Sequence, residues 1–152
     1  MADDIVIKEI ADLTALVVRR RARMDAMGEA LGEAFAAIMA QAQAGGAQFA
    51  GPPFCLYPGE MGEEIDVLVC MPVAPGAAGG PGVSVETIPG GTAATTMHHG
   101  PYSTIGETYG ALQAWIGAHG RQTAGPPREV YLNDPATVPA SELLTEIDWP
   151  VS

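Results

Sequence analysis

The 152-residue sequence contains little of several features that mark particular classes of protein. Its two cysteines are too few for a disulfide framework, and no apolar run approaches the roughly 20 residues that a membrane-spanning helix needs. The first residues are acidic, whereas a secretory signal peptide begins with basic residues. These absences predict a cytoplasmic protein that does not enter a membrane.

Basic residues are also scarce. Lys and Arg number 7 against 18 Asp and Glu, so the formal net charge is −11 at pH 7. Because a field of this sign repels phosphate groups, we expect no direct nucleic-acid contact and no binding to anionic lipid. Four of the basic residues lie within residues 19–23, which we interpret as a solvated strand end that pairs with Glu29 or Glu33.

Apolar residues, glycine and proline are abundant. Hydrophobic residues make up 47% of the chain, which is enough for one domain with a core and excludes an acidic disordered tail. The 19 glycines and 13 prolines gather in clusters that divide the chain into short elements. One cluster, residues 74–82, has no side chain able to pack and is interpreted as a flexible connector.

The sequences on the two sides of this connector resemble each other. Ala-Gly-Pro-Pro at residues 50–53 recurs at residues 124–127, and each copy precedes a short segment that ends in tyrosine. Further along, Met-Pro-Val at residues 71–73 matches Trp-Pro-Val at residues 149–151. The pattern predicts a single domain over residues 1–152, made by duplication. Repeat 1 covers about 4–73, the linker 74–82, and repeat 2 about 83–151.

Each repeat contains the same order of predicted elements. Repeat 1 has strands at residues 5–10 and 13–19, a helix at 25–44 with Asp25 as its N-cap, and strands at 53–57 and 65–71. Repeat 2 has strands at residues 83–88 and 92–98, a helix at 103–118, and strands at 128–132 and 143–149. The predicted fold is α+β. It consists of two strand–helix–strand–strand units related by pseudo-twofold symmetry, with an antiparallel sheet and both helices on one side.

Glu129 is the most informative polar residue, because it lies within a predicted strand where repeat 1 has Cys55. Side chains alternate across a strand, so one face would carry Glu129 with Tyr131, and Cys55 with Tyr57. The opposite face would pack under the helices, and it carries Phe54, Leu56 and Val130.

A carboxylate among tyrosines suits recognition of an organic cation, which the rings attract and the carboxylate neutralises. We expect this site in a cleft between the two repeats, where small ligands usually bind. The alternative is a solvent-facing Glu129 that pairs with Arg121 or Arg128, since most strand carboxylates are exposed.

Two further aromatic residues are candidates for the same site. Trp115 stands on the second helix where repeat 1 has the polar residue Gln41, which indicates asymmetric use of the axis. Filling of the core is an equally good interpretation of this tryptophan. Tyr102, at the start of that helix, either points its hydroxyl into the cleft or packs at the helix entry.

The histidines and cysteines do not predict a metal site, a cofactor or a nucleophile. His98 and His99 are adjacent, so on a strand they point to opposite faces and cannot readily share one metal ion. His119 is isolated near a helix end, and no pair of residues has zinc-ligand spacing. Cys55 and Cys70 are expected to be small buried hydrophobic residues. The glycines lack the spacing of nucleotide-binding loops.

Several motifs together resemble one known family. They are His-Gly-Pro-Tyr at residues 99–102, Leu112 and Trp115 on a helix, the segment 125–135, and the segment 142–147 followed by Pro-Val at 150–151. The sequence resembles the GyrI-like small-molecule-binding family, the effector-binding domain of AraC-type and BmrR-type multidrug regulators. The resemblance implies the duplicated fold and places Glu129 in an aromatic pocket that meets lipophilic cations. It also implies a stand-alone member, since only four residues precede Ile5 and a DNA-binding segment would lie there.

Three functions therefore remain open at this point. The first is a stand-alone protein that binds lipophilic, cationic aromatic compounds at Glu129. The second is a small hydrolase of electrophilic xenobiotics, because some stand-alone members resemble hydrolases that use the same Glu with a pocket Tyr. That resemblance implies Glu129 as general base, with Tyr131 or Tyr102 assisting. The third is a modulator of a larger protein such as gyrase, which would require a protein partner.

Overall fold

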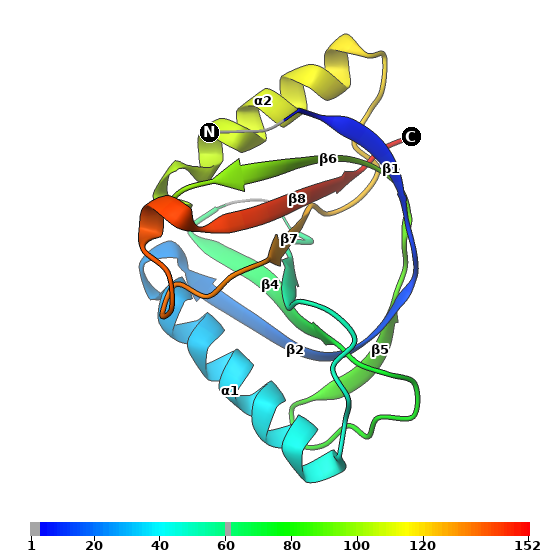
Figure 1. Cartoon of the computed structure of the whole chain (residues 1–152), viewed down its shortest axis with the longest axis vertical. Helices are drawn as coiled ribbons and strands as arrows, with labels where there is room; N and C mark the ends of the chain where they lie inside the picture. The colour runs from blue at the N-terminus through cyan, green and yellow to red at the C-terminus, as the bar shows by residue number, and fades with distance from the viewer. Residues whose placement is uncertain (1–3, 60–61) are drawn as a thin grey trace. The chain divides into compact units, whose positions relative to one another are not determined.

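The computed structural model describes residues 4–59 and 62–152. The chain folds into two compact units, each of which has an antiparallel sheet and one long helix (Figure 1). Unit 1 comprises the residues up to Ile10 together with Gly91–Ser152, and unit 2 comprises Ala11–Gly90. The predicted α+β class is confirmed.

Unit 1 contains a four-stranded antiparallel sheet in the order β1-β6-β8-β7. The strands are β1 (Val6–Ile10), β6 (Gly91–His99), β7 (Arg128–Tyr131) and β8 (Leu144–Pro150). Helix α2 (Ile105–Ala118) follows the short 3-10 helix η2 (Tyr102–Thr104) and packs on β6. A second 3-10 helix, η3 (Ala140–Glu142), precedes β8. The core between helix and sheet consists of Ala94, Leu112, Ile116, Ile147 and Val151.

Unit 2 repeats this arrangement with the strand order β3-β4-β2-β5. The strands are β2 (Leu13–Arg23), β3 (Phe54–Leu56), β4 (Glu64–Pro72) and β5 (Ser84–Ile88). Helix α1 (Met27–Gly45) packs on β2. It ends at Gly46, which has φ +65 and donates its N–H to the Ala42 carbonyl, a backbone conformation that favours glycine.

The first strand of each sequence repeat pairs with the other repeat. β1 pairs with β6, and β5 pairs with β2, so the strands that open the two repeats are exchanged. Ala11 and Asp12 connect β1 to β2, and Pro89 and Gly90 connect β5 to β6. The Asp12 carboxylate accepts a hydrogen bond of 2.7 Å from the Gly90 N–H, so the segment between β1 and β2 contacts the segment between β5 and β6.

Helix α1 begins differently from the prediction. Asp25 lies inside the 3-10 helix η1 (Met24–Ala26), and Ala26 is the N-cap of α1 without a side-chain hydrogen bond. The predicted cap is therefore wrong, because a 3-10 turn continues the chain into the helix and removes Asp25 from the capping position.

The arginine run also differs from its prediction. β2 continues through Arg23, so the arginines lie beside neighbouring strands. Arg19 forms a bidentate pair with Glu86 of β5, and Arg21 donates to Glu64 of β4 at 3.1 Å. The partners predicted on the helix, Glu29 and Glu33, are therefore wrong, because the strand register brings other carboxylates closer.

Residues 74–82 lie within unit 2 and are held against α1 by Gln41, whose amide donates to the Ala78 carbonyl at 3.2 Å.

In the part of the chain that the structure describes, neither helix is long and apolar enough to cross a membrane.

Candidate functional site

Glu129 of β7 is the centre of a polar cluster within unit 1. Its side chain is buried, with 8% of the residue exposed. The Tyr109 hydroxyl of α2 donates to Oε2 at 2.6 Å, and the Tyr131 hydroxyl of β7 donates to Oε1 at 2.9 Å. Each carboxylate oxygen thus accepts a phenolic hydrogen bond, which offsets part of the cost of burying this polar group.

The carboxylate faces helix α2. Glu129 is paired in register with Ile147 of β8, and Ile147 belongs to the core beneath α2 with Leu112. The alternation that was predicted to place Tyr131 beside Glu129 is confirmed by their hydrogen bond. The prediction that the Val130 face packs under the helix is wrong for unit 1. The pattern of apolar residues misled here, because phenolic donors allow a carboxylate on the helix side of the sheet.

Two pairs of aromatic rings extend from this carboxylate. Tyr102 meets Tyr131 edge to face, with ring centroids 5.9 Å apart and planes at 72°. Tyr109 meets Trp149 in the same manner, at 5.7 Å and 82°. Such pairs add to the stabilisation from burial alone. Glu129 is therefore linked through its two phenolic donors to four aromatic rings, one of which, Tyr102, is 40% exposed.

A buried histidine fixes the segment that carries Tyr102. His98 is fully buried, with Nδ1 2.6 Å from the Thr108 hydroxyl of α2 and Nε2 2.9 Å from the Pro101 carbonyl. Pro101 immediately precedes η2, so His98 links β6, α2 and the start of η2. His98 is buried while the adjacent His99 is exposed, as expected for neighbours on a strand.

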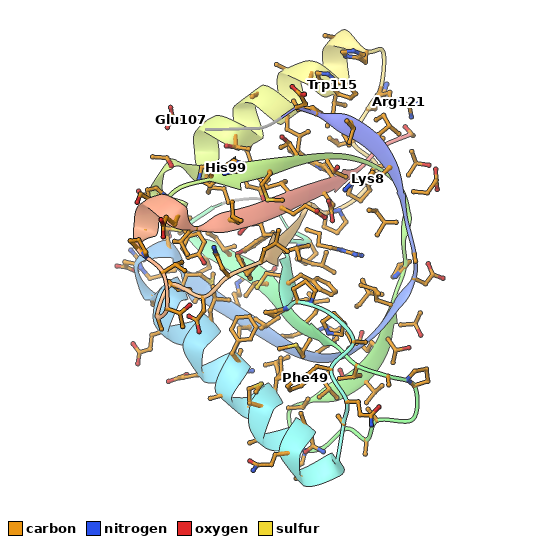
Figure 2. The ribbon with its side chains drawn as sticks, in the orientation of Figure 1. Lys8, Phe49, His99, Glu107, Trp115 and Arg121 are labelled. Atoms are coloured by element: carbon orange, nitrogen blue, oxygen red, sulfur yellow. The ribbon has the colours of Figure 1, made fainter. Side chains whose placement is uncertain are left out.

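The other predicted site residues occupy different places. Trp115 packs against the core of unit 1, and its ring stacks on His119 with centroids 3.9 Å apart. It lies near the end of α2, toward Arg121 (Figure 2). Trp115 lies six residues beyond Tyr109, which is about 9 Å along the helix axis. Cys55 is buried and Tyr57 half-buried in unit 2. Their part in a ligand site stays a prediction.

Sequence reasoning missed two residues of the cluster. Tyr109 lies at helical spacing from Leu112 and Ile116, and its ring packs against the core while its hydroxyl reaches Glu129. Trp149 lies two residues after Ile147 on the same face of β8, so the alternation of the strand could have identified it.

No arrangement of three or more His, Cys, Asp or Glu side chains suited to a metal ion occurs within residues 4–59 and 62–152. The site brings together the Glu129 carboxylate and the phenols of Tyr109 and Tyr131. These groups can neutralise a cation, surround it with rings, and exchange a proton.

Comparison with solved structures supports the fold. The C-terminal domain of EcmrR is 24% identical, with a TM-score of 0.85, and the match covers 98% of this chain and 97% of that one. An EcmrR–DNA complex is 25% identical with a TM-score of 0.87, and there the match covers 98% of this chain and 57% of the other.

Two more distant structures share the fold at 14% identity and a TM-score of 0.67. One is SAV2435 bound to tetraphenylphosphonium, where the match covers 99% of this chain and 94% of that one. The other is a hydrolase from Listeria innocua, with coverage of 97% and 91%. Among curated proteins none matches this chain.

The model of one protein family matches nearly the whole sequence. The match to the GyrI-like small molecule binding domain runs over residues 3–152 and includes both units. The chain belongs to the GyrI-like small-molecule-binding family.

Proposed function

We propose that this protein binds lipophilic, cationic aromatic compounds, and that Glu129 neutralises their charge. The observation that carries the proposal is the buried carboxylate held by Tyr109 and Tyr131 within a group of aromatic rings. The two phenols each donate to one carboxylate oxygen and keep the group oriented, while the ring faces attract a large cation.

The similarity to SAV2435, whose structure contains tetraphenylphosphonium, supports a ligand of this chemistry. Of the sequence-predicted rings, Tyr131 donates to Glu129 and Tyr102 meets the Tyr131 ring, so the exposed Tyr102 is the member that a ligand would meet first. Tyr109 and Trp149 extend the predicted set. Direct contact with nucleic acid is not proposed, because the net charge of −11 opposes it.

The test is calorimetric titration of tetraphenylphosphonium into wild type, E129Q and E142Q. Glu142 is exposed in the same unit, so E142Q removes the same charge outside the site. We expect E129Q to weaken binding by about 1–3 kcal/mol, or about 5- to 150-fold, and E142Q to bind as wild type does. Identical binding by E129Q and wild type would refute the role of Glu129.

A hydrolase is the second candidate, favoured by the 2.9 Å hydrogen bond between Tyr131 and Glu129. In this reaction Glu129 takes a proton from water as the water oxygen attacks an electrophilic carbon, and Tyr131 protonates the leaving oxygen. Similarity to a hydrolase from Listeria innocua supports it at the level of fold. Incubation with an aryl epoxide should then give a diol with wild type and none with E129Q. Unchanged epoxide after prolonged incubation with wild type would reject this function.

A further inference from the structure

The face of the unit 1 sheet turned away from α2 carries a cluster of charged side chains. Ile147 of β8 packs into the core beneath α2, so its neighbours Glu146 and Asp148 lie on the other face. Arg128 of β7 is paired in register with Asp148. Lys8 of β1 extends toward β8, with Nζ 3.8 Å from Oε1 of Glu146 (Figure 2).

Asp148 is the most buried acid of this cluster, with 4% of the residue exposed. Its Oδ1 is buried without a hydrogen-bond partner among the described residues. The Glu146 side chain, two residues away on the same face, is 24% exposed, so two carboxyl groups lie next to each other on this face.

The surroundings of Asp148 favour its protonated form. Burial is the largest cause that raises its pKa, and the neighbouring Glu146 carboxyl raises it further, to about 7. The positive charges of Arg128 and Lys8 act in the opposite direction. On β6 the titratable residue of this face is His99, which is exposed and paired in register with Leu144.

We propose that the buried Asp148 carboxyl carries its proton in the folded protein near neutral pH, and that it makes the protein more stable as the solution is acidified from neutral pH. The direction of this change in stability follows from the difference between the pKa of Asp148 in the folded and in the unfolded chain. In the unfolded chain the Asp148 carboxyl binds its proton only near its ordinary pKa of about 3.9, whereas the folded protein binds it near neutral pH. Stability therefore rises as pH falls below about 7, and the gain is complete near pH 4.

The test compares urea unfolding of wild type and D148N between pH 4 and 8, with E142Q as a control that removes one exposed charge from the same unit. The comparison with D148N cancels the titration of all groups that the two proteins share. We expect the unfolding equilibrium constant of wild type, divided by that of D148N, to fall by up to about tenfold for each pH unit below 7. E142Q should follow wild type.

A ratio that stays constant between pH 4 and 8 would overturn the proposal. Carbon-13 spectra of the wild-type carboxyl groups provide a second test that needs no variant and decides the matter if D148N does not fold. The Asp148 resonance should titrate near neutral pH, and a midpoint near its ordinary value would likewise overturn the proposal. Neither measurement depends on a ligand, so its outcome is separate from that of the binding experiment.

Discussion

Removal of the Tyr109 hydroxyl tests whether the phenols hold Glu129 as a buried, charged group. The Tyr109→Phe change deletes the donor that lies 2.6 Å from Oε2 and keeps the ring that packs against Trp149. A hydrogen bond to a charged group contributes about 1.5–3 kcal/mol, and we expect the free energy of unfolding to fall by this amount. For a chain of about 150 residues, a loss of about 2 kcal/mol lowers Tm by about 4–8 °C.

The assay is a double-mutant cycle by urea denaturation at pH 7, with wild type, Y109F, E129Q and the double variant. In the E129Q background the lost hydrogen bond is between neutral groups and contributes about 1 kcal/mol. Y109F should therefore cost less there, with a coupling energy of about 0.5–2 kcal/mol. Equal costs in the two backgrounds would refute the reasoning, because the hydroxyl would then stabilise the fold without regard to the charge of residue 129.

The remaining predictions concern the supports of the site. Thr108→Val leaves Nδ1 of the buried His98 without its hydroxyl partner, and we expect a loss of about 1–3 kcal/mol in thermal unfolding. Gly100, with φ +114, lies at the end of β6, and Gly100→Ala should cost about 1–3 kcal/mol through backbone strain. Gly106→Ala is the matched control, because an added Cβ meets nothing within 4 Å and helix propensity should raise stability by up to about 1 kcal/mol. A loss for both glycine variants, or none for Gly100→Ala, would contradict the assignment.

Much of the fold could be predicted because its signals are local. The glycine and proline clusters separate the elements, and apolar residues at helical spacing identify α1 and α2 within a few residues of their ends. The exchange of β1 and β5 could not be predicted in this way. Strand pairing depends on contacts between distant residues, and the sequence of each strand is compatible with either partner.

The candidate site was also predicted in part, to the extent that local sequence signals determine it. Strand alternation placed Tyr131 beside Glu129, and the hydrogen bond between them confirms it. The face that meets the helix was wrong, since alternation fixes which residues share a face and does not say what covers it. Tyr109 has both an apolar ring and a polar hydroxyl, so its place on an apolar helix face concealed its hydrogen bond to the carboxylate.

The burial of Asp148 could not be predicted from the sequence either. Glu146 and Asp148 alternate with apolar residues, as in a strand whose second face is solvated. The difference comes from burial, which leaves Oδ1 of Asp148 without a hydrogen-bond partner among the described residues.

The central claim is that Glu129 recognises the positive charge of its ligand, and a matched pair of ligands tests it most directly. The affinities of tetraphenylphosphonium and of neutral triphenylphosphine oxide would be measured by calorimetry for wild type and E129Q. We predict that wild type prefers the cation by about tenfold or more and that E129Q loses this preference. A preference for the cation of the same size in both proteins would contradict the claim.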